Sequence, residues 1–133
     1  MTVKELLANT RHLNRYIITL QRERELYQSL VAGLTASPQS ETVTECKANI
    51  AKVDADITAQ ISEAQHDIDL VHSMISGLSK PIYKELLTQY YILGYTWDSV
   101  ANNLGYSVPH IFRLHRDGIT ELEKIDRDSQ NDV

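Results

Sequence analysis

An apolar side chain recurs at every seventh position across residues 3–34, and this spacing constrains the fold more than any other feature of the chain. The first row is Leu6, Leu13, Leu20, Tyr27 and Leu34. The companion row holds Val3, Ile17 and Val31, and it is interrupted by Thr10 and Arg24. A seven-residue apolar repeat is typical of a long helix that packs along another helix.

The same repeat returns in residues 41–76, where the row is Val43, Ile50, Ile57, Ala64 and Val71. Between the two stretches, Gly33 and the small polar segment 36–40, which contains Pro38, favour a helix end followed by a loop. A short loop between two long helices favours antiparallel packing. We therefore predict a coiled-coil hairpin over residues 1–78, used for dimerisation or as a surface for a partner protein.

Part of the apolar stripe in the second stretch lies outside the main row. Ile61, Ile68 and Ile75 occupy these additional positions, together with Val53. An apolar stripe that the hairpin leaves uncovered has to be covered by another subunit or by a partner. The sequence therefore predicts a homodimer or higher oligomer formed through the N-terminal helices.

A third helix is predicted to open at Pro81, because proline in the first helical turn loses no hydrogen bond. Its apolar stripe reaches Tyr91, and Gly94 ends it. No segment of the chain alternates apolar and polar residues as a strand does, so the predicted fold is all-α. The polar residues 126–133 are expected to form a flexible tail.

Residues 96–116, TWDSVANNLGYSVPHIFRLHR, have the spacing of a helix-turn-helix. Ala101 fits where two helices cross closely, Gly105 follows where the turn needs a positive φ, and Ile111 points back into the crossing. Thr96 and Ser107 stand at the two N-cap positions. The remaining inward positions hold Trp97, Val100, Leu104, Tyr106 and Leu114. An ordinary helical hairpin with a glycine turn is the alternative that this spacing leaves open.

Residues 83–122 resemble region 4 of sigma-70-type factors, and they look closer still to small phage regulators of the RinA and ArpU type. The resemblance is carried by residues 91–115, YILGYTWDSVANNLGYSVPHIFRLH. It implies a DNA-binding domain at residues 79–125 in a transcriptional regulator of late phage or prophage genes, active in the cytoplasm of a bacterial host. Val108 and Pro109 depart from the group, which has basic residues there.

Several side chains on the second helix of this motif are expected to face outward and to contact double-stranded DNA. They are Ser107, His110, Phe112, Arg113 and Arg116, and Val108 and Pro109 share the outward face. We expect Arg113, nearer the helix start, to read bases and Arg116 to hold phosphate. The alternative for Arg116 is a pair with a neighbouring acid. For His115 two alternatives are open, a contact with phosphate or a base and a bond within the fold. Gly118 favours an end or a bend in this helix.

The charge balance is unusual for a protein that binds nucleic acid. The 133 residues carry 13 Lys and Arg against 18 Asp and Glu, a net charge of −5. Nucleic-acid-binding domains are usually basic, so DNA binding is expected to be local and helped by a partner such as RNA polymerase or by a second copy. The rival interpretation is a helical adaptor whose helix-turn-helix binds protein instead of DNA.

Nothing in the sequence indicates an enzyme, a cofactor or a metal site. No phosphate-cradling glycine loop is present, and His66, Asp69 and His72 spread too widely around a helix to hold one ion. The single cysteine, Cys46, rules out an internal disulfide and suits a reducing compartment. No apolar run reaches the ~18 residues of a membrane span, so the expected location is the cytoplasm, with no membrane partner.

Overall fold

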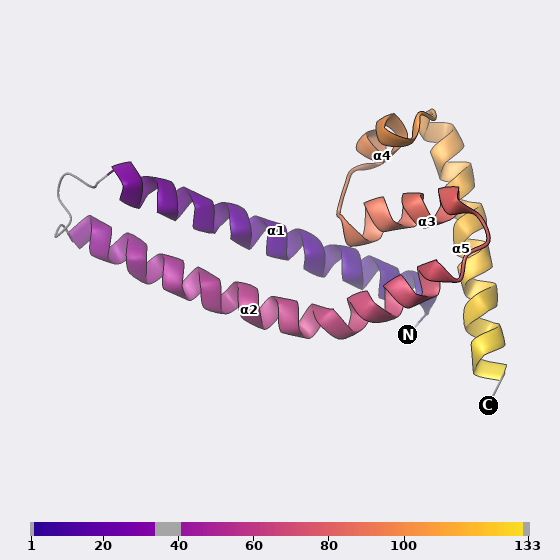
Figure 1. Cartoon of the computed structure of the whole chain (residues 1–133), viewed down its shortest axis with the longest axis horizontal. Coiled ribbons are helices and arrows are strands. Elements are labelled where there is room, and N and C mark those ends of the chain that lie inside the picture. Colours follow the sequence, from indigo (N-terminus) through magenta and orange to yellow (C-terminus); the bar gives the residue numbers. More distant parts are fainter. Residues whose placement is uncertain (1, 34–40, 132–133) are drawn as a thin grey trace. The chain divides into compact units, whose positions relative to one another are not determined.

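The computed structural model describes residues 2–33 and 41–131, and every regular element in these ranges is helical. The elements are α1 (Val3–Gly33), α2 (Glu41–Ser76), α3 (Pro81–Leu87), the π-helical turn η1 (Thr88–Ile92), α4 (Trp97–Leu104) and α5 (Val108–Asn131) (Figure 1). The prediction of an all-α fold is confirmed. The last heptad residue, Leu34, and the predicted loop 36–40 lie outside the described residues.

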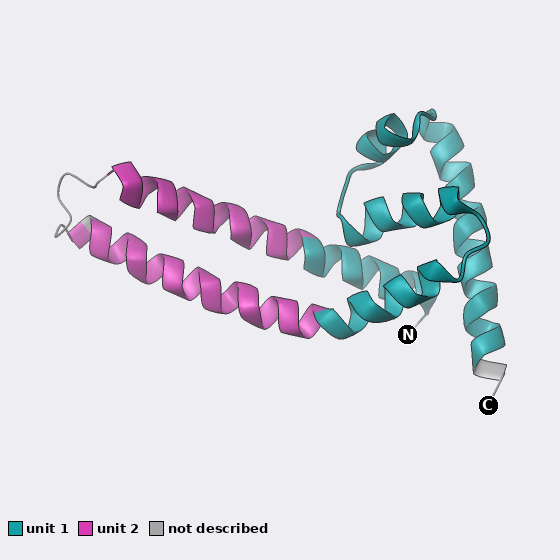
Figure 2. Cartoon of the chain, viewed as in Figure 1, with its two compact units in different colours: residues 1–14, 65–133 teal, residues 15–64 magenta. Residues whose placement is uncertain are grey.

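The chain divides into two compact units. Residues 1–14 and 65–133 form unit 1, and residues 15–64 form unit 2 (Figure 2). Both α1 and α2 therefore run from one unit into the other. The sequence pattern had suggested a division at residue 78, whereas the contacts assign the first turns of α1 and the last turns of α2 to the same unit as α3, α4 and α5.

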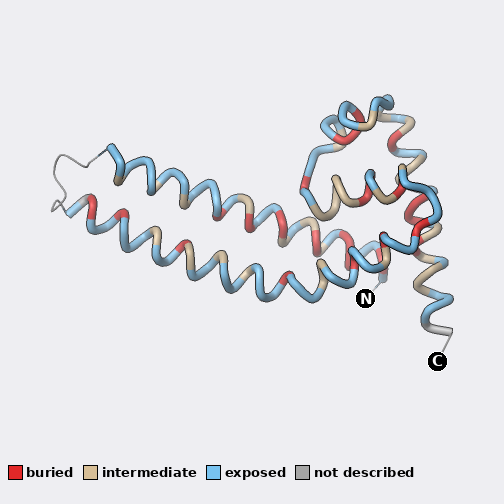
Figure 3. Tube along the Cα trace, in the orientation of Figure 1, coloured by how far each residue is buried: buried red, intermediate tan, exposed pale blue. Residues whose placement is uncertain are grey.

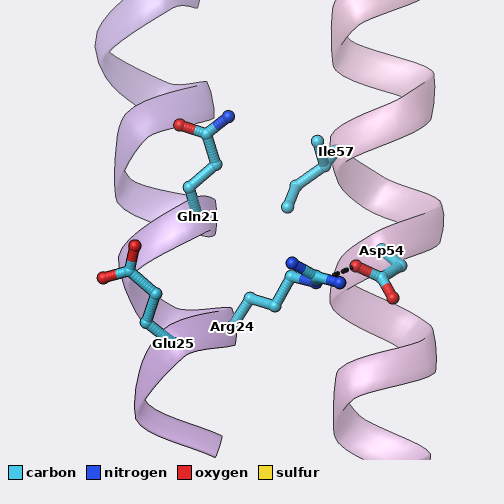
Figure 4. Close-up of a pocket in the computed structure, with 5 residues that line it drawn as sticks. All are labelled: Gln21, Arg24, Glu25, Asp54 and Ile57. Carbon is cyan, nitrogen blue, oxygen red and sulfur yellow. Dashed lines mark ion pairs between the residues drawn. The ribbon is translucent and has the colours of Figure 1, made fainter. Parts of the chain in front are cut away.

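Unit 2 consists of two helical stretches that run side by side in opposite directions (Figure 1). Buried positions recur along both of them, as the heptads require (Figure 3): Ile17, Leu20, Val43, Cys46, Val53 and Ala64. Arg24, which breaks the apolar row, forms an ion pair through its Nε with Asp54 on the facing stretch (Figure 4). Arg24 Nε makes no aligned hydrogen bond, so the contact is electrostatic. The charged residue that interrupts the heptad row, Arg24, is therefore paired with an acid on the facing helix.

Unit 1 contains a shared core to which its five α-helical segments and the segment after α2 contribute, and residues of η1 pack against it. Its buried members include Val3, Leu7, Val71, Leu78, Leu86, Val100, Ile111 and Leu122. Ile75, which the sequence assigned to an uncovered stripe, is buried here with 3% of its surface exposed. That expectation was wrong for Ile75 because the last turns of α2 pack into this core. Ile61 remains exposed and Ile68 is half-buried.

Gly118 does not end α5, which continues to Asn131. A Cβ at Gly118 would meet the Tyr83 side chain at 3.5 Å and Leu87 at 3.6 Å, so the glycine lies where α3 and α5 approach closely. Burial of Ile119 and Leu122 just beyond it keeps the helix on the core. Residues 126–131, which the sequence assigned to a tail, belong to the same helix.

Within the described residues, none of the helices combines the length and the apolar character that crossing a bilayer requires.

Candidate nucleic-acid interface

Local hydrogen bonds mark the starts of α4 and α5 and the turn between these two helices. Thr96 Oγ1 accepts from the Ser99 N–H at 3.2 Å at the start of α4, and Ser107 Oγ accepts from the His110 N–H at 3.3 Å at the start of α5. Gly105 has φ +77°, and the N–H groups of Gly105 and Tyr106 both donate to the Ala101 carbonyl. The caps and the positive φ therefore lie where the sequence predicted them.

The residues predicted to fill the crossing of α4 and α5 are mostly enclosed. Val100, Ala101 and Ile111 are buried, and Trp97, Leu104 and Leu114 are half-buried against the core. Gly105 itself is exposed in the turn. Tyr106, predicted to point inward, is instead 40% exposed, and its ring centroid lies 4.7 Å from that of His110 in an edge-on arrangement. The backbone reversal at Gly105 turns this side chain away from the crossing.

The predicted DNA-binding residues lie along the first half of α5. Ser107, Phe112, Arg113 and Arg116 are exposed, and His110 is half-buried. Val108, expected on the same face, packs partly against the core. Within the described part of the chain, neither Arg113 nor Arg116 forms an ion pair with an acid. Their guanidinium groups are therefore available to an external anion, and the alternative of an internal partner for Arg116 has no support in this structure.

Behind this face lies a group of rings that we call the aromatic cluster: Tyr90, Tyr91, Trp97, Phe112 and His115. Tyr90 stacks on Trp97 with 3.7 Å between ring centroids and 12° between planes. Trp97 in turn meets Phe112 edge-on at 5.5 Å and His115 at 4.8 Å. The cluster joins η1, α4 and α5, so it fixes the orientation of the outward face of α5 relative to the rest of unit 1.

His115 belongs to the aromatic cluster, as one of the two sequence-based alternatives proposed. Its Nε2 lies 2.7 Å from the Tyr91 hydroxyl, with which it shares a hydrogen bond. Burial lowers the pKa of His115 below its ordinary value, and the ammonium of Lys4 lowers it further. Burial also raises the pKa of Tyr91 to about 12, with Tyr90 adding to the rise and Arg11 opposing it. Both pKa shifts favour the uncharged form of the group, so the two side chains share this hydrogen bond as neutral partners.

Three polar residues of α1 take part in this region, and none of them was predicted from the sequence. The Arg11 guanidinium donates to the carbonyls of Tyr90 and Tyr95 and lies 3.8 Å over the Tyr90 ring. Asn14 Nδ2 donates to the Ile92 carbonyl at 2.8 Å. These bonds satisfy carbonyl groups at the end of η1, where the helix leaves them without partners. Arg11 and Asn14 therefore hold η1, and with it Tyr90, in place.

Lys4 is the third of these residues, and it brings a further positive charge to α5. It lines a shallow hollow of about 170 Å³ together with His115, Arg116 and Thr120. Lys4 and Arg116 thus stand at one depression from two different helices. An anion in this hollow would meet both positive charges, and the carboxylate of Glu123, which also lines the hollow, would oppose its binding.

No protein-family model, curated protein or solved structure was found that matches the chain. Over the described residues, no group of three or more His, Cys, Asp or Glu side chains is placed to hold a metal ion. On the outward face of α5, the described residues present the exposed cations Arg113 and Arg116 and the exposed ring of Phe112.

Proposed function

We propose that this protein is a DNA-binding transcriptional regulator of phage or prophage genes, of the RinA and ArpU type. In this proposal α4 and α5 form a helix-turn-helix similar to sigma-70 region 4, and α5 enters the major groove of double-stranded DNA. The paired long helices serve as the dimerisation or partner surface. The observation that carries the proposal is the pair of exposed arginines, Arg113 and Arg116, without an acidic partner among the described residues.

The arginines suit a nucleic-acid ligand because of where they stand on α5. They are three residues apart, so they lie on neighbouring parts of one helix face. Arg113 is the nearer to the helix start, where a recognition helix usually contacts bases, and a guanidinium can bond guanine O6 and N7 together. Arg116 shares a hollow with Lys4, which suits a phosphate group.

The test is a salt-titrated binding measurement on duplex DNA from a phage late-promoter region, with and without RNA polymerase. We expect Arg113→Ala to weaken binding by ~1–3 kcal/mol and to relax sequence preference. Arg116→Ala should weaken binding to all sequences alike and reduce the salt slope by about one. Lys124→Ala, which removes an exposed charge further along the same helix, serves as the control and should bind like the wild type.

The second candidate function is a helical adaptor that binds a protein such as RNA polymerase. It is favoured by the net charge of −5 and by Val108 and Pro109, which put no cation at the start of α5. In the same experiment, the adaptor function would appear as binding to polymerase with no binding to DNA. Equal DNA binding by the wild type and both arginine variants would also reject the regulator function.

A further inference from the structure

The apolar ring of Phe112 is exposed to solvent. It stands on α5 between buried Ile111 and exposed Arg113, and 49% of its surface is accessible. Among the described residues of α5 it is the large apolar side chain left exposed, whereas Ile111, Ile119 and Leu122 are buried. A single exposed apolar residue is common on protein surfaces, so exposure alone indicates no ligand. The surroundings of the ring carry more information.

The Phe112 ring is held in place by a column of stacked groups from three elements. Arg11 of α1 lies over Tyr90 at 3.8 Å, Tyr90 stacks on Trp97 at 3.7 Å, and Trp97 meets the Phe112 ring edge-on at 5.5 Å. One side of Phe112 is thus packed and its other side is presented outward. A ring fixed in this way loses little conformational freedom when it contacts a ligand.

The charges beside Phe112 restrict what the ring can contact. Arg116 is one turn further along α5, and Arg113 is the next residue, and both are exposed. A ligand that fits must offer a small apolar group close to negative charge. The major groove of duplex DNA offers this combination in the 5-methyl group of thymine, which lies between phosphate backbones and is known to accept contacts from phenylalanine.

We propose that Phe112 contacts the methyl group of a thymine and makes that thymine a required base of the DNA sequence bound. The inference rests on the proposed function, because it places α5 in the major groove. It adds the base that this face recognises and assigns the recognition to an apolar contact. In this arrangement the arginines supply hydrogen bonds to guanine and phosphate, and Phe112 distinguishes thymine from cytosine, which lacks the methyl group.

The experiment uses the full chain and duplex DNA. The preferred sequence is first selected from a pool of random duplexes and then synthesised again with uracil in place of each thymine in turn. Uracil pairs as thymine does and lacks only the methyl group. We expect one such replacement to weaken wild-type binding about fourfold, which corresponds to the roughly 0.8 kcal/mol of a buried methyl group. Phe112→Ala should bind the thymine and uracil duplexes equally.

Two controls keep the outcomes distinct. Tyr16→Ala removes an aromatic ring of similar exposure from α1 and should keep the full response to uracil. Phe112→Leu, which preserves an apolar side chain, should keep part of it, and melting curves show whether each variant is folded. If wild-type binding prefers one sequence but responds to no uracil, or if Phe112→Ala responds as the wild type does, the thymine contact is refuted and the regulator function stands. If the wild type binds no duplex while Phe112→Ala loses binding to RNA polymerase, both proposals fail and Phe112 contacts protein.

Discussion

Gly105 and Gly118 show how the same residue type meets two opposite requirements. Gly105 has φ +77°, and a Cβ built there meets no atom within 4 Å. Gly118 lies inside α5 with ordinary backbone angles, and its nearest Cβ contact is 3.5 Å. The first glycine is thus required by the backbone alone, and the second leaves room for a methyl group.

This difference predicts opposite effects for one substitution. Gly105→Ala should lower the free energy of unfolding by ~1–2 kcal/mol, because alanine is strained in the left-handed region. Gly118→Ala should raise it by up to ~1 kcal/mol, because alanine favours the helix and the new contacts are of ordinary length. Urea unfolding of both variants provides the measurement. A loss of stability at Gly118 as large as that at Gly105 would mean that α3 and α5 approach more closely than described.

His115 should make stability depend on pH below its ordinary pKa. The folded protein holds the pKa of His115 below 6.5, so the unfolded chain takes up this proton first as the pH falls. The contribution of His115 to stability is therefore full above about pH 6.5 and is lost as the pH falls towards the folded pKa. Replacing the imidazole by the amide in His115→Gln removes this titration.

The measurement compares urea unfolding of the wild type and His115→Gln at about pH 7.5 and about pH 5.5. We expect the wild type to lose more stability across this interval than the variant. Carboxyl groups titrate alike in both proteins, so they cancel in the difference. An identical loss in both proteins would show that the His115 pKa is the same in the folded and unfolded states.

The position of η1 depends on side chains of α1. Arg11 donates hydrogen bonds to the carbonyl of Tyr90 in η1 and to that of Tyr95 just after it, and its guanidinium lies over the Tyr90 ring. We expect Arg11→Gln to lower the free energy of unfolding by ~1–3 kcal/mol, because the part-buried Tyr90 carbonyl loses a charged donor and the Tyr90 ring loses its cation. Arg22→Gln, at an exposed position of the same helix, should change it by less than about 0.5 kcal/mol. Similar melting temperatures for the two variants would show that α1 does not hold η1.

The helices themselves were predictable because their signals are local. The heptads marked α1 and α2, and Pro81 marked the start of α3. Thr96 and Ser107 marked the starts of α4 and α5, and Gly105 marked the turn between them. The hydrogen bonds from Arg11 and Asn14 to η1 and the residues after it were not predictable, because the acceptors lie 77 to 84 residues further along the chain. For the candidate site, the sequence identified exposed Arg113, Arg116 and Phe112. Lys4 was not predicted, because it reaches α5 from α1, which is more than 100 residues away in the chain. Tyr106 was placed wrongly, because its direction depends on the backbone turn at Gly105.

At the scale of the whole molecule, self-association remains a prediction that rests on α2. Ile61 is 42% exposed in unit 2. If a second copy covers it, Ile61→Glu should shift the protein to the monomer, because a charge in an apolar interface is costly. Ser62→Glu adds the same charge at the neighbouring exposed position and should leave the association unchanged. Sedimentation equilibrium measures the masses, and a monomeric wild type would reject the dimer while leaving the helices as they are.

Unit 1 combines the first residues of the chain with residues 65–133, so its core can form only late in synthesis. Val3, Leu6 and Leu7 share a core with Ile119 and Leu122, from the opposite end of the described chain. A ribosome adds about 5–20 residues per second, so the first turns of α1 wait on the order of ten seconds for α5 to emerge. Unit 2 is synthesised well before then, and pairing of its two antiparallel stretches shortens the loop that the core of unit 1 has to close. We infer that α5, which is synthesised last, packs onto helices that have already formed. The face that carries Phe112, Arg113 and Arg116 is therefore completed at the end of folding.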